Sequence, residues 1–299
     1  MSLPPLFSFE IYSRRWTFRM KKFVKPLIVG IMALAGIGLL AYPKVSNMLA
    51  VVNQTTAIDG YRKSVEELTQ EQRDAEWARA QTYNAALGGI TIADPFSGGN
   101  AGAENREYDT LLDQNGIMGY VEIAKIGVRL PILHGTSDQV LDHAVGHLEG
   151  TSLPVGGAGT HSVLTGHRGL PSAKLFTDLD QVGVGDTFEV FVLGRQLLYT
   201  VDEIKVVEPT DTSALKLFPD KDYVTLLTCT PYGINSHRLL VRGVRTDLPP
   251  AQEGIEPVPA PDYTPLYAVL GGVGGAGILA GVLLLREKRR KRKDHDEEE

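Results

Sequence analysis

The sequence predicts a mostly-β domain, a closed or nearly closed barrel of mixed strands with short helices, placed between two transmembrane helices. Short apolar segments recur from Ile117 onward and are separated by glycine, proline and aspartate, which is typical of strands joined by turns. Many short strands with only brief helices favour a barrel. With 299 residues, the chain allows one domain of moderate size plus appendages, or two small domains.

Two uncharged apolar runs, residues 26–43 and 263–285, are long enough to cross a bilayer as helices. Basic residues precede the first run and follow the second. Under the positive-inside rule, tails 1–25 and 286–299 are cytoplasmic and the segment between the spans is extracellular. The first run could instead be a cleaved signal peptide, and the second a tail anchor or the remnant of a cut sorting signal. We predict a two-span protein of the cell membrane.

Charge and cysteine content restrict the partners and the covalent chemistry. The net charge is −6, but basic residues crowd both tails, which is a topology signal and predicts no nucleic-acid partner. Cys229 is the single cysteine, so no intrachain disulfide is possible. A free thiol in an exported domain is more often reactive than not, although a lone buried cysteine is also a common core residue.

The segment before the barrel, residues 46–103, is predicted to form a helical stalk and a loop. Its apolar residues have helical spacing, with an interruption expected near Asp59–Gly60. Residues 88–103 form a glycine-rich loop that contains Asp94 and, unusually for a polar loop, Phe96. The apolar residues of the helical part are Ile58, Tyr61, Val65 and Leu68.

The barrel itself is assigned to residues 104–246 and is followed by a proline-rich, semi-rigid tether, 247–262. Ser137 is expected to cap a short helix that carries Val140 and Leu141. The expected strands are residues 117–123, 128–132, 162–165, 187–193, 197–207, 223–228 and 238–244.

Three side chains at the ends of predicted strands suggest a cysteine-nucleophile acyl-transfer enzyme. Such an enzyme needs a thiolate, an acid for the leaving amine and a cationic group where the oxyanion develops, and Cys229, His167 and Arg238 supply one candidate for each. Adjacent antiparallel strands would place the Arg238 guanidinium beside the sulfur. Because a guanidinium stays protonated, Arg238 would hold the substrate carbonyl and favour the thiolate.

Of the seven histidines, His167 has the most distinctive setting, since flanking glycines allow close approach of the backbone to a ligand. His143 and His147 are spaced i, i+4, which on a helix makes half a metal site. No third ligand with convincing spacing follows, so we expect neither a metal nor a cofactor. The remaining histidines, in loops, a short helix or the charged tail, are His134, His161, His237 and His295.

At these motifs the chain resembles the sortases, membrane-bound cysteine transpeptidases of Gram-positive bacteria. The resemblance spans about residues 46–286. Asp94-Pro95-Phe96 ahead of the barrel, together with a second span, is similar to class C, the pilus-building type. The matching stretches are Thr165-Gly166-His167, the Thr225–Pro231 segment (TLLTCTP) and the Arg238–Gly243 segment (RLLVRG).

The resemblance implies an eight-stranded barrel and a role for each site residue. Cys229 would be the nucleophile, His167 the general acid and then base, and Arg238 the partner of the substrate carbonyl or oxyanion. Asp94 and Phe96 would form a lid, with Asp94 facing Arg238 and Phe96 resting on Cys229. The segment from Lys205 to Asp222 would frame the substrate groove.

The chemistry that the resemblance implies is cleavage of the Thr–Gly bond in an LPXTG-like sorting signal of a pilin, followed by attack of a lysine amine from another pilin. The partners would be pilins or surface proteins with such signals, and the membrane. Three alternatives stay open: a sortase that joins its substrate to cell-wall peptide, a non-enzymatic membrane-tethered adhesion or scaffold protein with Cys229 in its core, and a secreted cysteine protease that uses water.

Overall fold

The structure is a computed structural model of the chain, and it describes residues 9–87, 93–96 and 106–247 together with the single residues 272 and 286. The chain divides into two compact units, Met1–Ser46 and Asn47–Glu299. The predicted tether and the predicted second span lie almost entirely outside the described residues, so both stay predictions.

The N-terminal unit is helical from Phe9, where helix α1 (Phe9–Glu67) begins. Within the described part of the chain, Gly30–Glu67 is the one segment long and apolar enough to cross a membrane, and its most apolar stretch has no buried residue. Its exposed apolar side chains, such as Met32, Leu39 and Leu40, suit a lipid environment better than water. The length and composition of this helix suit a membrane anchor.

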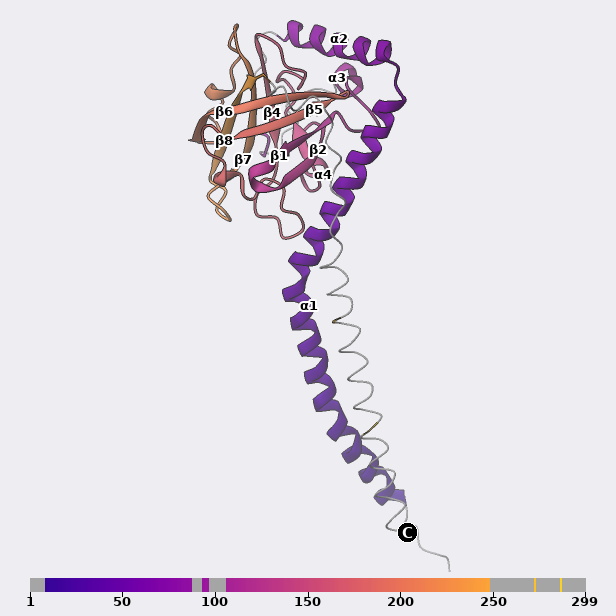
Figure 1. Cartoon of the computed structure of the whole chain (residues 1–299). Helices are drawn as coiled ribbons and strands as arrows, with labels where there is room; N and C mark the ends of the chain where they lie inside the picture. The colour runs from indigo at the N-terminus through magenta and orange to yellow at the C-terminus, as the bar shows by residue number, and fades with distance from the viewer. Residues whose placement is uncertain (1–8, 88–92, 97–105, 248–271, 273–285, 287–299) are drawn as a thin grey trace, which may run out of the picture. The chain divides into compact units, whose positions relative to one another are not determined.

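The second unit is built around a closed barrel of eight strands, as predicted (Figure 1). The order around the barrel is β1-β2-β3-β4-β7-β8-β6-β5; the pairs β2/β3 and β4/β7 are parallel and the others antiparallel. The barrel is therefore of mixed type. The strands are β1 (Gly119–Ile123), β2 (Val128–His134), β3 (Val145–His147), β4 (Thr160–Thr165), β5 (Thr187–Val192), β6 (Arg195–Val207), β7 (Asp222–Thr230) and β8 (His237–Thr246).

Helical elements between and before the strands are short, apart from α1 and α2. The part of α1 within the second unit and α2 lie along one side of the barrel (Figure 1). These elements are α2 (Gln70–Ala86), α3 (Arg106–Thr110), α4 (Asp138–Leu141), and the 3-10 helices η1 (Ala124–Ile126), η2 (Leu179–Gln181) and η3 (Ser213–Leu215).

Strand β7 shows how alternation divides the apolar residues between two clusters. Val224 and Leu226 point into the barrel core, where Phe176, Tyr199 and Phe188 are fully buried. The intervening residues point outward. On that outer face lies a smaller cluster, against which Phe96, Val207 and Ala214 pack, formed by Leu148, Val163, Leu215, Leu227 and Leu240.

The predicted interruption of the stalk near Asp59–Gly60 is wrong, because α1 continues through both residues. A helical glycine costs only about 1 kcal/mol relative to alanine, and the buried side chains of Ile58, Tyr61 and Val65 on either side offset that cost. The break lies instead at Leu68–Thr69. There the Thr69 hydroxyl accepts from the Gln72 amide and the Gln72 side chain accepts from the Thr69 amide, a capping box that starts α2.

His143 and His147 do not share a helix, so their spacing does not make half a metal site. Helix α4 ends at Leu141, and His147 lies in the three-residue strand β3, which the sequence did not predict. His147 is fully buried, its Nε2 lies 2.8 Å from the Ser152 carbonyl oxygen, and burial lowers its pKa to about 4. The described residues contain no group of three or more ligands that could hold a metal.

Candidate active site

Strands β7 and β8 bring Cys229 and Arg238 together in the way that adjacent antiparallel strands allow. The two residues are direct partners in the β7/β8 register, and the short loop between the strands returns the chain to the same end of the barrel. Both point to the outer face, and Cys229 is only 6% exposed. The thiol is therefore covered, with a guanidinium next to it.

His167 comes to the same end because β4 runs parallel to β7 and ends beside it. Its position is fixed through Gly166, whose amide donates to the Leu227 carbonyl at 3.0 Å and whose carbonyl accepts from the Thr228 hydroxyl at 2.7 Å. The His167 carbonyl accepts from the Phe176 amide at 3.1 Å. These bonds hold the segment that carries His167 against β7, the strand that carries Cys229.

Sequence reasoning assigned no role to Thr228 or to Phe176. A Cβ added to Gly166 would lie 2.7 Å from the Phe176 ring, so glycine is required for the ring to pack there. Strand alternation is the signal that points to Thr228, because a threonine next to an outward-facing Cys229 must itself face inward. Nothing in the sequence near Phe176 indicates its contact with Gly166.

The Arg238 guanidinium makes four hydrogen bonds. Its Nε and Nη2 donate to the two carboxylate oxygens of Asp94 at 2.7 and 2.8 Å, and its Nη1 donates to the carbonyls of Asn235 and His237 at 3.1 Å. The Arg238 and Asp94 side chains are each 10% exposed. A bidentate pair of this kind is stronger than a single neutral hydrogen bond, and it occupies the donors that a substrate carbonyl would need.

Phe96 lies against His167 and Arg238. Its ring centroid is 5.3 Å from that of His167, and the Arg238 guanidinium carbon is 5.1 Å from the Phe96 centroid. The ring thus contacts both the imidazole and the guanidinium. The expected contact of Phe96 with the Cys229 sulfur stays a prediction.

The electrostatics of the covered site favour neutral groups. Burial raises the pKa of the Cys229 thiol and the Asp94 carboxylate raises it further, while Arg238 opposes both. Burial lowers the pKa of His167, against which Asp142 and Asp138 act. A neutral thiol beside a neutral imidazole is a poor nucleophile. In this arrangement, removal of Asp94 and exposure to water would both shift Cys229 toward the thiolate.

Comparison with known proteins identifies this arrangement. The family model of the sortase domain matches residues 121–246. The structure of sortase C-1 from Actinomyces oris is 48% identical, with a TM-score of 0.57 over 59% of this chain and 99% of that one. The chain belongs to the sortase family. Sortase C of Streptococcus pneumoniae, described in relation to pilin substrate specificity, is 44% identical with a TM-score of 0.61, over 64% of this chain and 97% of that one.

These solved neighbours are class C sortases, and the chain belongs with them. A curated relative, sortase D of Bacillus subtilis (strain 168), is 30% identical over 130 residues. That alignment covers 42% of this sortase and 63% of its relative, which is less than two thirds of the relative's length.

Proposed function

We propose that this sortase is a membrane-anchored cysteine transpeptidase that cleaves the Thr–Gly bond of LPXTG-like sorting signals and joins pilin subunits through lysine isopeptide bonds. The observation that carries the proposal is the convergence of Cys229, His167 and Arg238 at one end of the barrel, with Asp94 bound across the guanidinium. The similarity to sortase C of Streptococcus pneumoniae, described in terms of pilin substrates, supports the pilin assignment.

The reaction begins when the lid segment, residues 93–96, leaves the site. Arg238 then loses its carboxylate partner and can donate to the threonine carbonyl oxygen of the substrate. With Asp94 gone, the proton of the Cys229 thiol passes to His167, and the adjacent guanidinium stabilises the thiolate.

Acyl transfer then follows in two steps. The Cys229 sulfur attacks the threonine carbonyl carbon, Arg238 stabilises the oxyanion, and His167 donates its proton to the leaving glycine amine, which leaves a thioester. A lysine amine of a second pilin attacks the thioester, its proton passes to His167, and Cys229 is released as the amide forms. No cofactor takes part in this scheme.

The proposed topology has two membrane spans, residues 26–43 and 263–285, with both termini in the cytoplasm and the barrel outside. The apolar, unburied α1 segment and the basic residues that flank both runs support it. Because its substrates also begin as membrane-anchored proteins, tethering raises the effective concentration at which they meet the enzyme.

The test uses the full chain in detergent micelles, an LPXTG peptide and intact mass spectrometry. Wild type, Cys229→Ala and the double variant Asp94→Ala/Phe96→Ala are run side by side. We expect an acyl adduct and a threonine-ended product that need Cys229 and increase in the double variant.

Two acceptors then separate the subtypes. A lysine-containing pilin peptide and a cell-wall peptide amine compete for the thioester, and we expect the lysine to give most of the product. Preference for the wall peptide would instead support the anchoring sortase. Absence of any adduct, while a known sortase cleaves the same peptide, would argue against the transpeptidase itself.

A further inference from the structure

The outer face of the barrel around Cys229 is ordered in rows that cross neighbouring strands. Each row lies two residues further from the nucleophile, which is about 7 Å along a strand. Strand β6 continues the rows beyond β8, with Lys205 beside Leu240 and Glu203 beside Arg242. The rows on β7 and β8 are Cys229 with Arg238, Leu227 with Leu240, and Thr225 with Arg242.

The second row carries an unsatisfied hydroxyl on its β4 side. Thr165 pairs with Leu227 in the β4/β7 register and is fully buried. Its Oγ1 has no hydrogen-bond partner among the residues that the structure describes.

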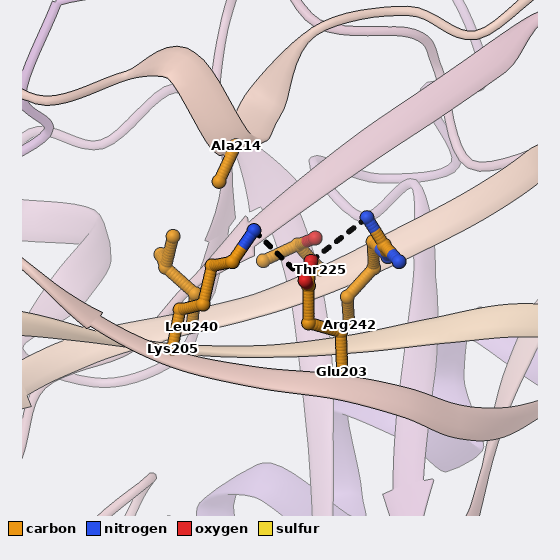
Figure 2. A pocket seen from close by; sticks show the side chains of 6 residues that line it. All are labelled: Glu203, Lys205, Ala214, Thr225, Leu240 and Arg242. Atoms are coloured by element: carbon orange, nitrogen blue, oxygen red, sulfur yellow. Dashed lines mark ion pairs between the residues drawn. The ribbon is translucent and has the colours of Figure 1, made fainter.

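The third row ends in a small hollow with charged walls (Figure 2). Figure 2 shows the Lys205 ammonium and the Arg242 guanidinium converging on the Glu203 carboxylate, with ion pairs of 2.8 and 2.9 Å. Leu240 and Ala214 add apolar surface, and Thr225 adds a hydroxyl that lies 2.8 Å from Nε2 of His161. The hollow is small, with about 10 Å³ of free volume, so it can receive the polar head of a side chain whose stem stays outside it.

The distance from the nucleophile decides which substrate residue would reach this hollow. Thr225 lies four residues before Cys229 on the same strand, about 13 Å away. An extended or polyproline-like peptide advances about 3.1–3.4 Å per residue, so the same distance takes about four residues of substrate. With the scissile threonine at Cys229, four residues upstream is the residue immediately before the leucine of the signal.

The charged side chains of the hollow would receive an incoming anion and an incoming cation differently. Glu203 is shared by two cations, and Arg242 is further occupied by Asp202, which accepts from Nε and Nη2. The Lys205 side chain is 47% exposed, and among the described residues its ion pair is with Glu203. An incoming carboxylate therefore finds an accessible ammonium, whereas an incoming ammonium must compete with Lys205 and Arg242 for two carboxylates, Glu203 and Asp202, that are already paired.

We propose that this hollow is a specificity subsite that reads the residue immediately before the leucine of the sorting signal and favours an acidic side chain there. The proposal rests on the proposed function, since it needs a sorting signal with its threonine at Cys229. Lys205 is the specificity-determining residue, and Glu203, which is itself paired with Arg242, holds it in place.

The test uses the full chain with Asp94→Ala/Phe96→Ala in micelles and three peptides that differ only before the leucine, where they carry glutamate, glutamine or lysine. We expect kcat/KM to fall in that order over about threefold to tenfold, the range of one partly exposed ion pair. Lys205→Gln should reduce the range to under about twofold. High salt should reduce it as well.

Lys125→Gln is the matched control. Lys125 is also 47% exposed and also pairs with one carboxylate, Asp186, but it lies in η1 between β1 and β2. This variant should keep the full preference for glutamate. Equal rates for the three peptides, or an unchanged preference in Lys205→Gln, would overturn the proposal.

Binding separates a failure of the subsite from a failure of the proposed function. Fluorescence anisotropy of the same peptides with Cys229→Ala in the lid-opened chain should give the same order of affinity. If binding follows the order but no peptide is cleaved by the Cys229 enzyme, the subsite stands and the transpeptidase proposal fails. If the peptides are cleaved but bind and react without preference, the transpeptidase proposal stands and the subsite proposal fails.

Discussion

Two arginines on β8 are bound in the same way by partners of different origin. Arg238 and Arg242 lie on the same outer face, each makes a bidentate pair with an aspartate, and each lies over an aromatic ring. The guanidinium carbons are 5.1 and 4.3 Å from the Phe96 and Tyr223 centroids, respectively.

The difference lies in the elements that supply those partners. Asp202 and Tyr223 belong to β6 and β7, the two strands that flank β8, so the Arg242 pair opens only if the barrel opens. Asp94 and Phe96 belong to the lid segment that precedes the barrel in sequence. The same chemistry therefore joins strands at one position and covers a reactive centre at the other.

The largest expected effect comes from comparing the removal of the two guanidinium groups, because only that of Arg238 should be needed for the reaction. Arg238→Gln in the lid-opened chain should slow thioester formation by about 10²–10³-fold, because it removes the oxyanion partner. Arg242→Gln should stay within about fivefold of its parent, since it touches the substrate only upstream. Intact mass spectrometry over time measures both rates, and similar losses in the two variants would contradict the catalytic role of Arg238.

A smaller effect, on the reactivity of the Cys229 thiol, is expected from removing the carboxylate of Asp94. Asp94→Asn should raise the rate of Cys229 alkylation by about tenfold near neutral pH, because the carboxylate raises the pKa of the thiol and the lid limits its access. The midpoint of the alkylation rate against pH should move to lower pH, because the carboxylate that raises the thiol pKa is gone.

Asp202→Asn is the control for that measurement. Its carboxylate bonds Arg242, whereas the charges that act on the pKa of Cys229 are those of Arg238 and Asp94. The alkylation rate and its midpoint should match wild type. A shift of equal size in both variants would mean that the lid pair has no special link to the thiol.

Alternation and strand order made much of this arrangement predictable. The segment ending in Cys229 and the strand carrying Arg238 could be paired from the sequence, because a short loop between apolar strands predicts antiparallel neighbours. The closed barrel followed from the number and brevity of the strands. The roles of Cys229, His167 and Arg238 were suggested by the residue types and then by the resemblance, whereas the lid came from the resemblance alone, and all of these roles stay predictions.

Other features depend on contacts that no local pattern reports. Strand β3 has three residues and no period of its own, so its pairing with β2 and β4 defines it. The helix through Gly60 is set by packing on the barrel, which overrides the weak local break. The positions of Thr165 and Lys205 relative to Cys229 follow from the strand register, which pairs Thr165 with Leu227 and Lys205 with Leu240. The sequence alone does not give that register.

The smallest expected effect concerns stability, and it sharpens the distinction between the two pairs. Asp202→Asn should lower the Tm of the full chain in micelles by about 2–4 °C, a loss of about 1 kcal/mol, since the Arg242 side chain stays at 16% exposure between strands that cannot separate. Asp94→Asn should lower it by less than about 1 °C. Movement of the lid segment lets water reach Arg238, whose Nη1 keeps its bonds to two backbone carbonyls. Circular dichroism measures both transitions.

A larger loss for Asp94→Asn would mean that breaking this pair leaves a buried charge without compensation, and the lid segment would then be a part of the barrel rather than a removable cover.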